Sequence, residues 1–160
     1  MITCENVTQE PRRLAEPVAP PKRTCKIVLA EDEMAIREFM AGALREMGYT
    51  VVATPNGQEA LRLFWGSHDD KIDLLVTDIV MPVMGGKELA YHVSRLSPET
   101  KIVFSSAYPE KLAQRNEMID RKIPFLQKPT TAAALIQMVQ ELLAEPDTSI
   151  PDEPAVSDVD

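Results

Sequence analysis

The sequence of 160 residues is poor in the features that mark several large classes of protein. Its two cysteines, Cys4 and Cys25, are too few for a disulfide framework or a zinc site, and they predict free thiols in a reducing compartment. No apolar run approaches the roughly 18 to 20 residues that a membrane span needs. The N-terminus also lacks the apolar core of a secretory signal. We therefore expect a cytoplasmic chain without membrane contact.

Positive charge is scarce as well. The formal net charge is −8, and the last 16 residues hold six acids and no base. The sequence has no basic stripe of the kind that DNA or RNA binding requires, so we expect no direct contact with nucleic acid. The two histidines, His68 and His92, fall in or beside predicted helices and are interpreted as surface residues.

Proline and charge separate the two ends from the middle of the chain. Residues 10–23 contain four prolines, which favours an extended linker over residues 1–25. The acidic, proline-containing residues 145–160 have too few large apolar groups to offset the entropy of folding, and they predict a disordered tail. The folded domain should therefore cover residues 26–144.

Strand-like and helix-like segments alternate within this domain. Short apolar runs predict strands over residues 26–30, 50–54, 73–77, 101–106 and 124–127. Helical spacing follows each of them, over residues 31–49, 56–65, 86–96, 109–119 and 130–144. In the first helix the predicted inner face comprises Ile36, Phe39, Met40, Ala43, Leu44 and Met47. Five such βα units predict an α/β fold, a parallel five-stranded sheet between two layers of helices.

Polar side chains follow the predicted strands at the edge where parallel sheets bind ligands. Glu31 and Asp32 follow the first strand and Asp78 the third, while Ser105 and Ser106 end the fourth. Lys128 and Pro129 follow the fifth strand. Three neighbouring carboxylates repel one another unless a cation lies between them, and an oxygen-only ligand set suits Mg²⁺ before Ca²⁺ or Zn²⁺.

A cation site with a lysine and a hydroxyl is suited to phosphoryl chemistry. Mg²⁺ and Lys128 would neutralise phosphoryl oxygens, and the Ser106 hydroxyl could donate to one of them. Asp78 would be the nucleophile, because carboxylates form aspartyl-phosphates.

Four segments then show a family resemblance: "VLAEDE" (28–33), "DLLVTDIVMPVMGG" (73–86), "SSA" (105–107) and "FLQKP" (125–129). They resemble the receiver domain of bacterial two-component response regulators, over about residues 26–144. The resemblance implies a flavodoxin-like fold, that is, a (βα)5 three-layer sandwich with strand order 2-1-3-4-5.

The resemblance also implies a role for each matching residue. Asp78 is similar to the phosphoacceptor, which a histidine kinase or histidine phosphotransfer protein would phosphorylate. The implied Mg²⁺ ligands are Glu31, Asp32, Asp78 and the backbone carbonyl of Val80. The residues implied to contact the phosphoryl group or to switch with it are Ser106, Ala107, Lys128 and Phe125. The positions implied to shape the loops are Pro82, Gly86 and Pro129, the last often following a cis peptide bond.

Some positions depart from the commoner family residues. Glu31 stands in place of the commoner Asp, Ser106 in place of Thr, and Phe125 in place of Tyr. In the family, the residues two past the acceptor and two past the hydroxyl border the path of attacking water. Here they are Val80 and Tyr108, which offer no acid or amide to orient a water, so we expect slow loss of the phosphoryl group.

Several alternatives stay open from the sequence. An aspartyl-phosphate phosphatase or mutase would carry a second acid at position 80, and a flavin-binding protein would carry a hydroxyl- and glycine-rich loop after the first strand. We expect no fused output module in this sequence. The domain is then a single-domain regulator or the C-terminal receiver of a hybrid sensor kinase, and we favour the hybrid or relay association. A homodimer that forms on phosphorylation also stays open, and the sequence does not indicate the downstream partner.

Overall fold

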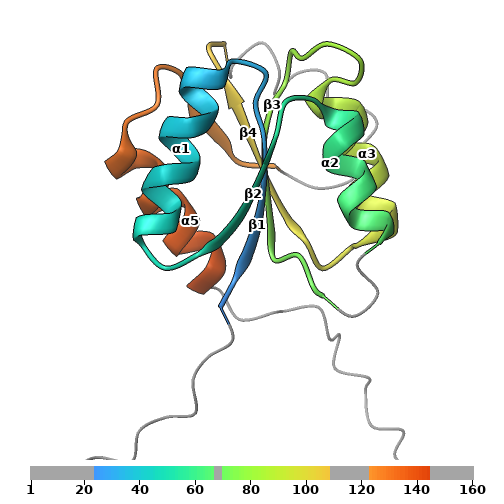
Figure 1. The fold of residues 1–160 in the computed structure, drawn as a ribbon, viewed down its shortest axis with the longest axis horizontal. Helices are drawn as coiled ribbons and strands as arrows, with labels where there is room; N and C mark the ends of the chain where they lie inside the picture. Colours follow the sequence, from blue (N-terminus) through green and yellow to red (C-terminus); the bar gives the residue numbers. More distant parts are fainter. Residues whose placement is uncertain (1–23, 67–69, 109–122, 145–160) are drawn as a thin grey trace, which may run out of the picture.

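The computed structural model describes residues 24–66, 70–108 and 123–144 (Figure 1). Within these ranges, strands and helices alternate along the chain: β1 (Lys26–Ala30), α1 (Met34–Glu46), β2 (Thr50–Thr54), α2 (Gly57–Trp65), β3 (Leu74–Asp78), α3 (Gly86–Leu96), β4 (Lys101–Ser106), β5 (Phe125–Gln127) and α5 (Ala132–Ala144). The helix predicted over 109–119, the acidic tail and nearly all of the predicted linker lie outside the described residues. Among the described helices, none has the length and apolar character of a membrane span.

The five strands form one parallel sheet. Their order is β2-β1-β3-β4-β5, and each neighbouring pair runs parallel. Figure 1 shows α1 and α5 on one face of the sheet and α2 and α3 on the other. The predicted three-layer flavodoxin-like fold is therefore confirmed, and the carboxyl ends of all five strands lie at one edge of the sheet.

Alternating side chains of the strands build a core on each face. In β1, Val28 and Ala30 pack toward α2 and α3, whereas Ile27 and Leu29 pack toward α1 and α5. Residues 74–76 of β3 are fully buried, which fits a central strand with both faces covered. We call these cores the α2/α3 core and the α1/α5 core.

The predicted inner face of α1 is partly wrong. The buried residues of the helix are Met40, Ala41 and Leu44, while Phe39 is 50% exposed and Met47, just past the helix, is 46% exposed. Only a narrow stripe of α1 contacts the α1/α5 core, and Phe39 lies beside that stripe. The predicted cap of α2 is confirmed, because the side chain of Asn56 accepts a hydrogen bond from the Glu59 N–H at 2.9 Å.

The loop from β3 to α3 owes its shape to a close backbone approach. A Cβ atom on Gly86 would lie 2.0 Å from the carbonyl oxygen of Asp78, so only glycine fits there. The Gly86 N–H also donates to the Ile79 carbonyl at 2.8 Å. Positive φ in this loop occurs instead at Val83, where φ is 70°. The helix thus begins tightly against the end of the strand that carries Asp78.

Candidate functional site

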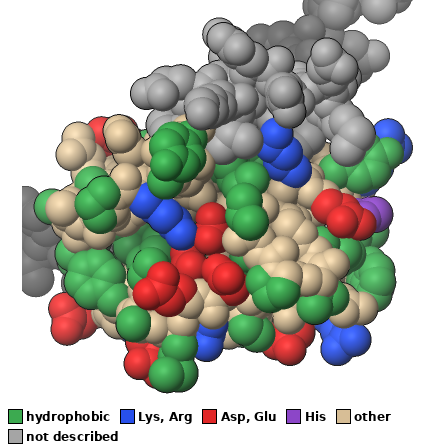
Figure 2. Space-filling model, turned by 90° about the horizontal axis from the view of Figure 1, so that it is seen from above, with side chains coloured by type: hydrophobic (Ala, Val, Ile, Leu, Met, Phe, Trp, Pro, Cys, Tyr) green, Lys and Arg blue, Asp and Glu red, His purple; other side chains and the backbone are tan. Residues whose placement is uncertain are grey.

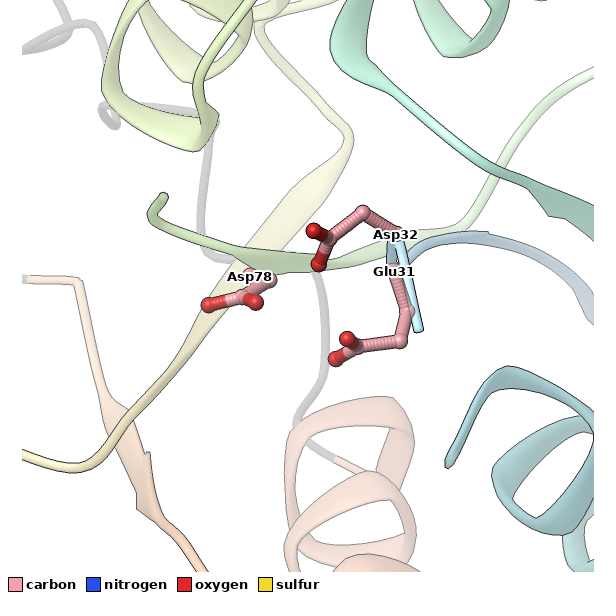
Figure 3. Close-up of side chains that lie close together, drawn as sticks. All are labelled: Glu31, Asp32 and Asp78. Carbon is pink, nitrogen blue, oxygen red and sulfur yellow. The ribbon is translucent and has the colours of Figure 1, made fainter. Parts of the chain in front are cut away.

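Three carboxylates meet at the carboxyl edge of the sheet. Glu31 and Asp32 follow β1, and Asp78 ends the adjacent strand β3 (Figure 3). Figure 3 shows their carboxylate groups facing a common space, and one oxygen of each lies within 4.8 Å of the others. The structure therefore brings Asp78 together with two acids that stand 46 and 47 residues before it in the sequence.

Lys128 joins two of these acids. Its Nζ donates to Oδ2 of Asp78 at 2.9 Å and to Oε2 of Glu31 at 3.1 Å. Its backbone N–H donates to the Ser106 carbonyl at 2.9 Å, which continues the ladder between β4 and β5 by one residue. The Lys128–Pro129 peptide bond is cis. Because β4 lies between β5 and β3, the lysine side chain crosses a whole strand to reach the acids.

The carboxylate of Asp78 is held at both oxygens. Oδ1 accepts a hydrogen bond from the Ile79 N–H at 2.7 Å, and Oδ2 accepts from Lys128. The Asp78 side chain keeps 12% of its surface exposed. This carboxylate is thus fixed in orientation and still open to an incoming group.

Burial and neighbouring charges have opposing effects on the pKa values of Glu31 and Lys128. Burial raises the pKa of Glu31, and the negative charge of Asp78 adds to this, although the hydrogen bond from Lys128 opposes it. For Lys128, burial alone lowers the pKa, but the hydrogen bonds to Asp78 and Glu31 outweigh it and raise the pKa. The lysine therefore stays charged at neutral pH, while ionisation of Glu31 carries an energetic cost.

A pocket of about 380 Å³ opens over the acceptor. It is lined by Asp78, Ile79, Val80, Ser106, Ala107, Tyr108 and Lys128. The Ser106 hydroxyl oxygen accepts a hydrogen bond from the Tyr108 N–H at 3.0 Å, which leaves the hydroxyl hydrogen available to donate. Val80 and Tyr108 are 80% and 64% exposed. Seen from above in Figure 2, acidic side chains gather near the middle of this face, with hydrophobic side chains around them.

Phe125 lies beside this region and is half-buried. Its ring packs against Phe104 of the α2/α3 core, with ring centroids 5.7 Å apart and planes tilted by 38°. The predicted role of Phe125 as a switch stays a prediction.

Arg37 is a residue of the site that the sequence pattern did not reveal. Its Nη1 donates to the carbonyl of Glu31 at 2.8 Å and to that of Asp32 at 3.2 Å. This guanidinium fixes the backbone that carries both acids. The one indication in the sequence is that Arg37 is the first basic residue after the acidic residues 31–33, in the helix that follows them.

The donor set fits Mg²⁺. All three side chains of the cluster offer hard carboxylate oxygens, which divalent magnesium prefers. The negative charge of Asp78 also raises the pKa of Glu31, and a bound cation would oppose that effect.

Comparison with known proteins agrees with this geometry. The family model of the response regulator receiver domain matches residues 27–140. The chain belongs to the response regulator receiver domain family.

Three relatives show how the domain occurs elsewhere. Sensor kinase CckA of Brucella abortus is 36% identical over 76% of this chain, which spans only 13% of the length of that kinase. Response regulator receiver protein CpdR of Brucella abortus is 32% identical over 74% of this chain and 96% of its own length. The crystal structure of the receiver domain from hybrid histidine kinase CckA aligns with a TM-score of 0.63 at 30% identity, over 74% of this chain and 98% of that one. This receiver domain of two-component signalling is thus similar both to a kinase domain and to a single-domain protein.

Proposed function

We propose that this receiver domain accepts a phosphoryl group on Asp78 from a phosphohistidine of a histidine kinase or phosphotransfer protein. An Asp78 carboxylate oxygen forms the new P–O bond, the P–N bond breaks, and the released imidazole nitrogen takes up a proton. The observation that carries the proposal is the carboxylate of Asp78, held by Lys128 and the Ile79 N–H at the floor of an open pocket.

Glu31, Asp32, Asp78 and the Val80 carbonyl would hold Mg²⁺. When bound, the ion supplies positive charge that offsets the negative charge of the phosphoryl group. On the other side of the pocket, the Lys128 ammonium and the Ser106 hydroxyl can donate to phosphoryl oxygens, and the small side chain of Ala107 leaves room for the donor. Phe125, β5 and α5 would respond to phosphorylation, together with the helix that the sequence predicts over residues 109–119, outside the described residues.

Val80 supports a signalling role over an enzymatic one. A phosphatase or mutase of the aspartyl-phosphate type needs a second acid at this place, and Val80 is apolar and 80% exposed. Likewise, Glu31 and Asp32 lie where a flavin phosphate would have to bind, and they would repel it.

Phosphorylation by acetyl phosphate tests the proposal directly. With Mg²⁺ present, intact-protein mass spectrometry should show a gain of one phosphoryl group that is lost in hydroxylamine. The Asp78→Asn variant should show none, because its amide is not a nucleophile. Ser94→Ala, which changes a hydroxyl on α3 away from the site, should be phosphorylated like the wild type. Equal labelling of wild type and Asp78→Asn would contradict the proposal.

We also propose that the phosphoryl group persists for many minutes. Val80 and Tyr108 line the pocket over Asp78, and neither side chain offers an acid or amide that would orient a water for attack on phosphorus. Decay of the labelled protein should be slow, and Val80→Asn, which adds an amide, should accelerate it. Decay within seconds in the purified wild type would contradict this.

The similarity to the CckA receiver favours a place in a relay over isolated action. The chain and the CckA kinase share 36% identity in this domain. A purified CckA-type kinase core should therefore transfer label to this chain faster than acetyl phosphate does. A slower transfer would remove the support for a relay and leave phosphorylation of Asp78 itself untouched.

A further inference from the structure

Ser105 of β4 carries a buried hydroxyl that the proposed phosphoryl transfer leaves unused. It is 1% exposed, and within the described residues its Oγ is the buried side-chain polar atom that has no hydrogen-bond partner. The next residue differs, because the Ser106 oxygen accepts from the Tyr108 N–H. An unpaired buried hydroxyl destabilises a folded protein, so Ser105 calls for an explanation.

The sheet register places Ser105 between the acids and Lys128. Ser105 lies beside Asp78 of β3 on one side and beside Leu126 of β5 on the other. Leu126 belongs to the α1/α5 core, as do Val76 and Val103. Side chains alternate along strands, so Asp78 (two after Val76), Ser105 (two after Val103) and Lys128 (two after Leu126) project to this same face.

The register therefore places Ser105 between the strand that Lys128 follows and the acids that its ammonium reaches. Its ammonium reaches Asp78 on β3 and Glu31, the residue after β1, with β4 in between. Neighbouring strands lie about 4.8 Å apart, so a retreat of the ammonium by about one strand spacing brings it to Ser105. An ammonium group has three N–H donors, and two of them are engaged by the acids.

We propose that Ser105 is a positioning residue for Lys128. Its hydroxyl oxygen accepts a hydrogen bond from the ammonium when Mg²⁺ takes over the carboxylates of Glu31 and Asp78. This inference rests on the proposed Mg²⁺ site. A bound Mg²⁺ would compete with the Lys128 ammonium for the same carboxylate oxygens, and a partly buried ammonium that leaves them would need a new acceptor. Ser105 thus destabilises the metal-free protein and stabilises the metal-loaded one.

The Ser105→Ala variant should move two measurements in opposite directions. Without metal, its melting temperature should rise by about 2–6 °C, since the unpaired hydroxyl is gone. Its Mg²⁺ dissociation constant, measured by calorimetry, should rise about threefold to tenfold, the value of one hydrogen bond. Ser105→Thr keeps the hydroxyl and should retain the wild-type affinity.

Thr100→Val is the matched control at the opposite end of β4. Thr100 is fully buried, and its hydroxyl donates to the Ile72 carbonyl at 2.8 Å. Removing this paired hydroxyl should lower the melting temperature and leave the Mg²⁺ dissociation constant unchanged.

A double-mutant cycle with Lys128→Met isolates the proposed contact. In the Lys128→Met background no ammonium has to move, so Ser105→Ala should no longer change the Mg²⁺ dissociation constant. An equal effect in both backgrounds would overturn the inference, as would wild-type affinity in Ser105→Ala. Wild-type protein that binds no Mg²⁺ would overturn the proposed metal site as well.

Discussion

The two edges of the sheet treat their buried polar groups in opposite ways. At the amino edge, Asp73 accepts a hydrogen bond from the Lys26 N–H at 2.8 Å, and the Thr100 hydroxyl donates to the Ile72 carbonyl. At the carboxyl edge, Glu31 is 1% exposed beside the charge of Asp78, and the Ser105 hydroxyl is unpaired within the described residues. At the amino edge, hydrogen bonds to buried polar groups stabilise the fold. At the carboxyl edge, a buried charge and an unpaired hydroxyl destabilise it.

The glycines at the two edges of the sheet are required for different physical reasons. At the carboxyl edge, Gly86 is required by a backbone contact, because its Cβ would lie 2.0 Å from the Asp78 carbonyl oxygen. After α1, Gly48 is required by its φ of 92°, and among the described residues no atom beyond its chain neighbours lies within 4 Å of the place of its Cβ. Gly86 is required by a close contact and Gly48 by its backbone conformation, so we expect substitution by alanine to lower the free energy of unfolding by different amounts at the two positions.

The largest effect is expected from Gly86→Ala. The added methyl group forces α3 away from the end of β3, so the free energy of unfolding should fall by about 3 kcal/mol. Gly48→Ala should lose only about 1 kcal/mol, because the methyl group meets no atom and the cost is that of the positive φ. Urea unfolding of both variants measures the difference. A smaller loss for Gly86→Ala than for Gly48→Ala would contradict the close approach.

Lys128→Met should have the next largest effect. It leaves Glu31 and Asp78 without their cation, and we expect a loss of about 2 kcal/mol at pH 7. Because the metal can replace the missing charge, saturating Mg²⁺ should restore much of this stability.

The amino edge supplies the control for this charge. Lys26→Met removes an ion pair to Asp70, whose side chain is 74% exposed, and should cost at most about 0.5 kcal/mol. Comparable losses in the two lysine variants, measured by urea unfolding, would mean that the carboxyl edge is no more charge-dependent than the amino edge.

Glu31→Gln should stabilise the metal-free fold by about 1 kcal/mol at pH 7. Burial raises the pKa of Glu31 above its ordinary value of 4.5, so the folded protein holds this proton more tightly than the unfolded chain does. The contribution of Glu31 to stability is then present below pH 4.5 and is lost as the pH rises through the folded pKa. The advantage of Glu31→Gln should therefore shrink as the pH falls toward 4.5.

Unfolding at pH 7 and pH 5 measures that change. The same variant should bind Mg²⁺ more weakly, because an amide replaces a carboxylate ligand. Asp73→Asn at the amino edge serves as the contrast, since it disturbs the acceptor of the Lys26 N–H and should destabilise the fold. A constant difference between wild type and Glu31→Gln across this pH range would contradict the raised pKa.

The sequence alone predicted which side chains lie together, because the order of the strands in a parallel sheet determines which strand ends are neighbours. Glu31, Asp78 and Lys128 each stand at a strand end, and the winding of the chain brings strand ends to one edge. Apolar runs marked the strands to within one residue, so Asp78 ends β3 where the pattern had placed it one residue beyond.

What the sequence did not predict depends on side-chain direction. Arg37 donates hydrogen bonds to backbone carbonyls. Every residue has a backbone carbonyl, so the sequence does not indicate which ones accept. The exposure of Phe39 depends on how narrow a stripe of α1 the core accepts. Whether the Ser105 hydroxyl has a hydrogen-bond partner depends on its distance to each neighbouring polar atom. These are packing outcomes, and spacing alone does not encode them.

Val83→Gly, in the loop between β3 and α3 beside the site, should have the smallest effect on the free energy of unfolding. Val83 has a φ of 70° although it is β-branched and 74% exposed, so no packing offsets its strain. Glycine removes the strain but adds freedom to the unfolded chain, which leaves a net gain of about 0.5 kcal/mol. Val83→Ala, which keeps a Cβ, should gain less than Val83→Gly in the same urea titration. If both variants destabilise the protein, the exposed valine is held by contacts that outweigh its backbone strain, and the carboxyl edge would be better packed than its exposure indicates.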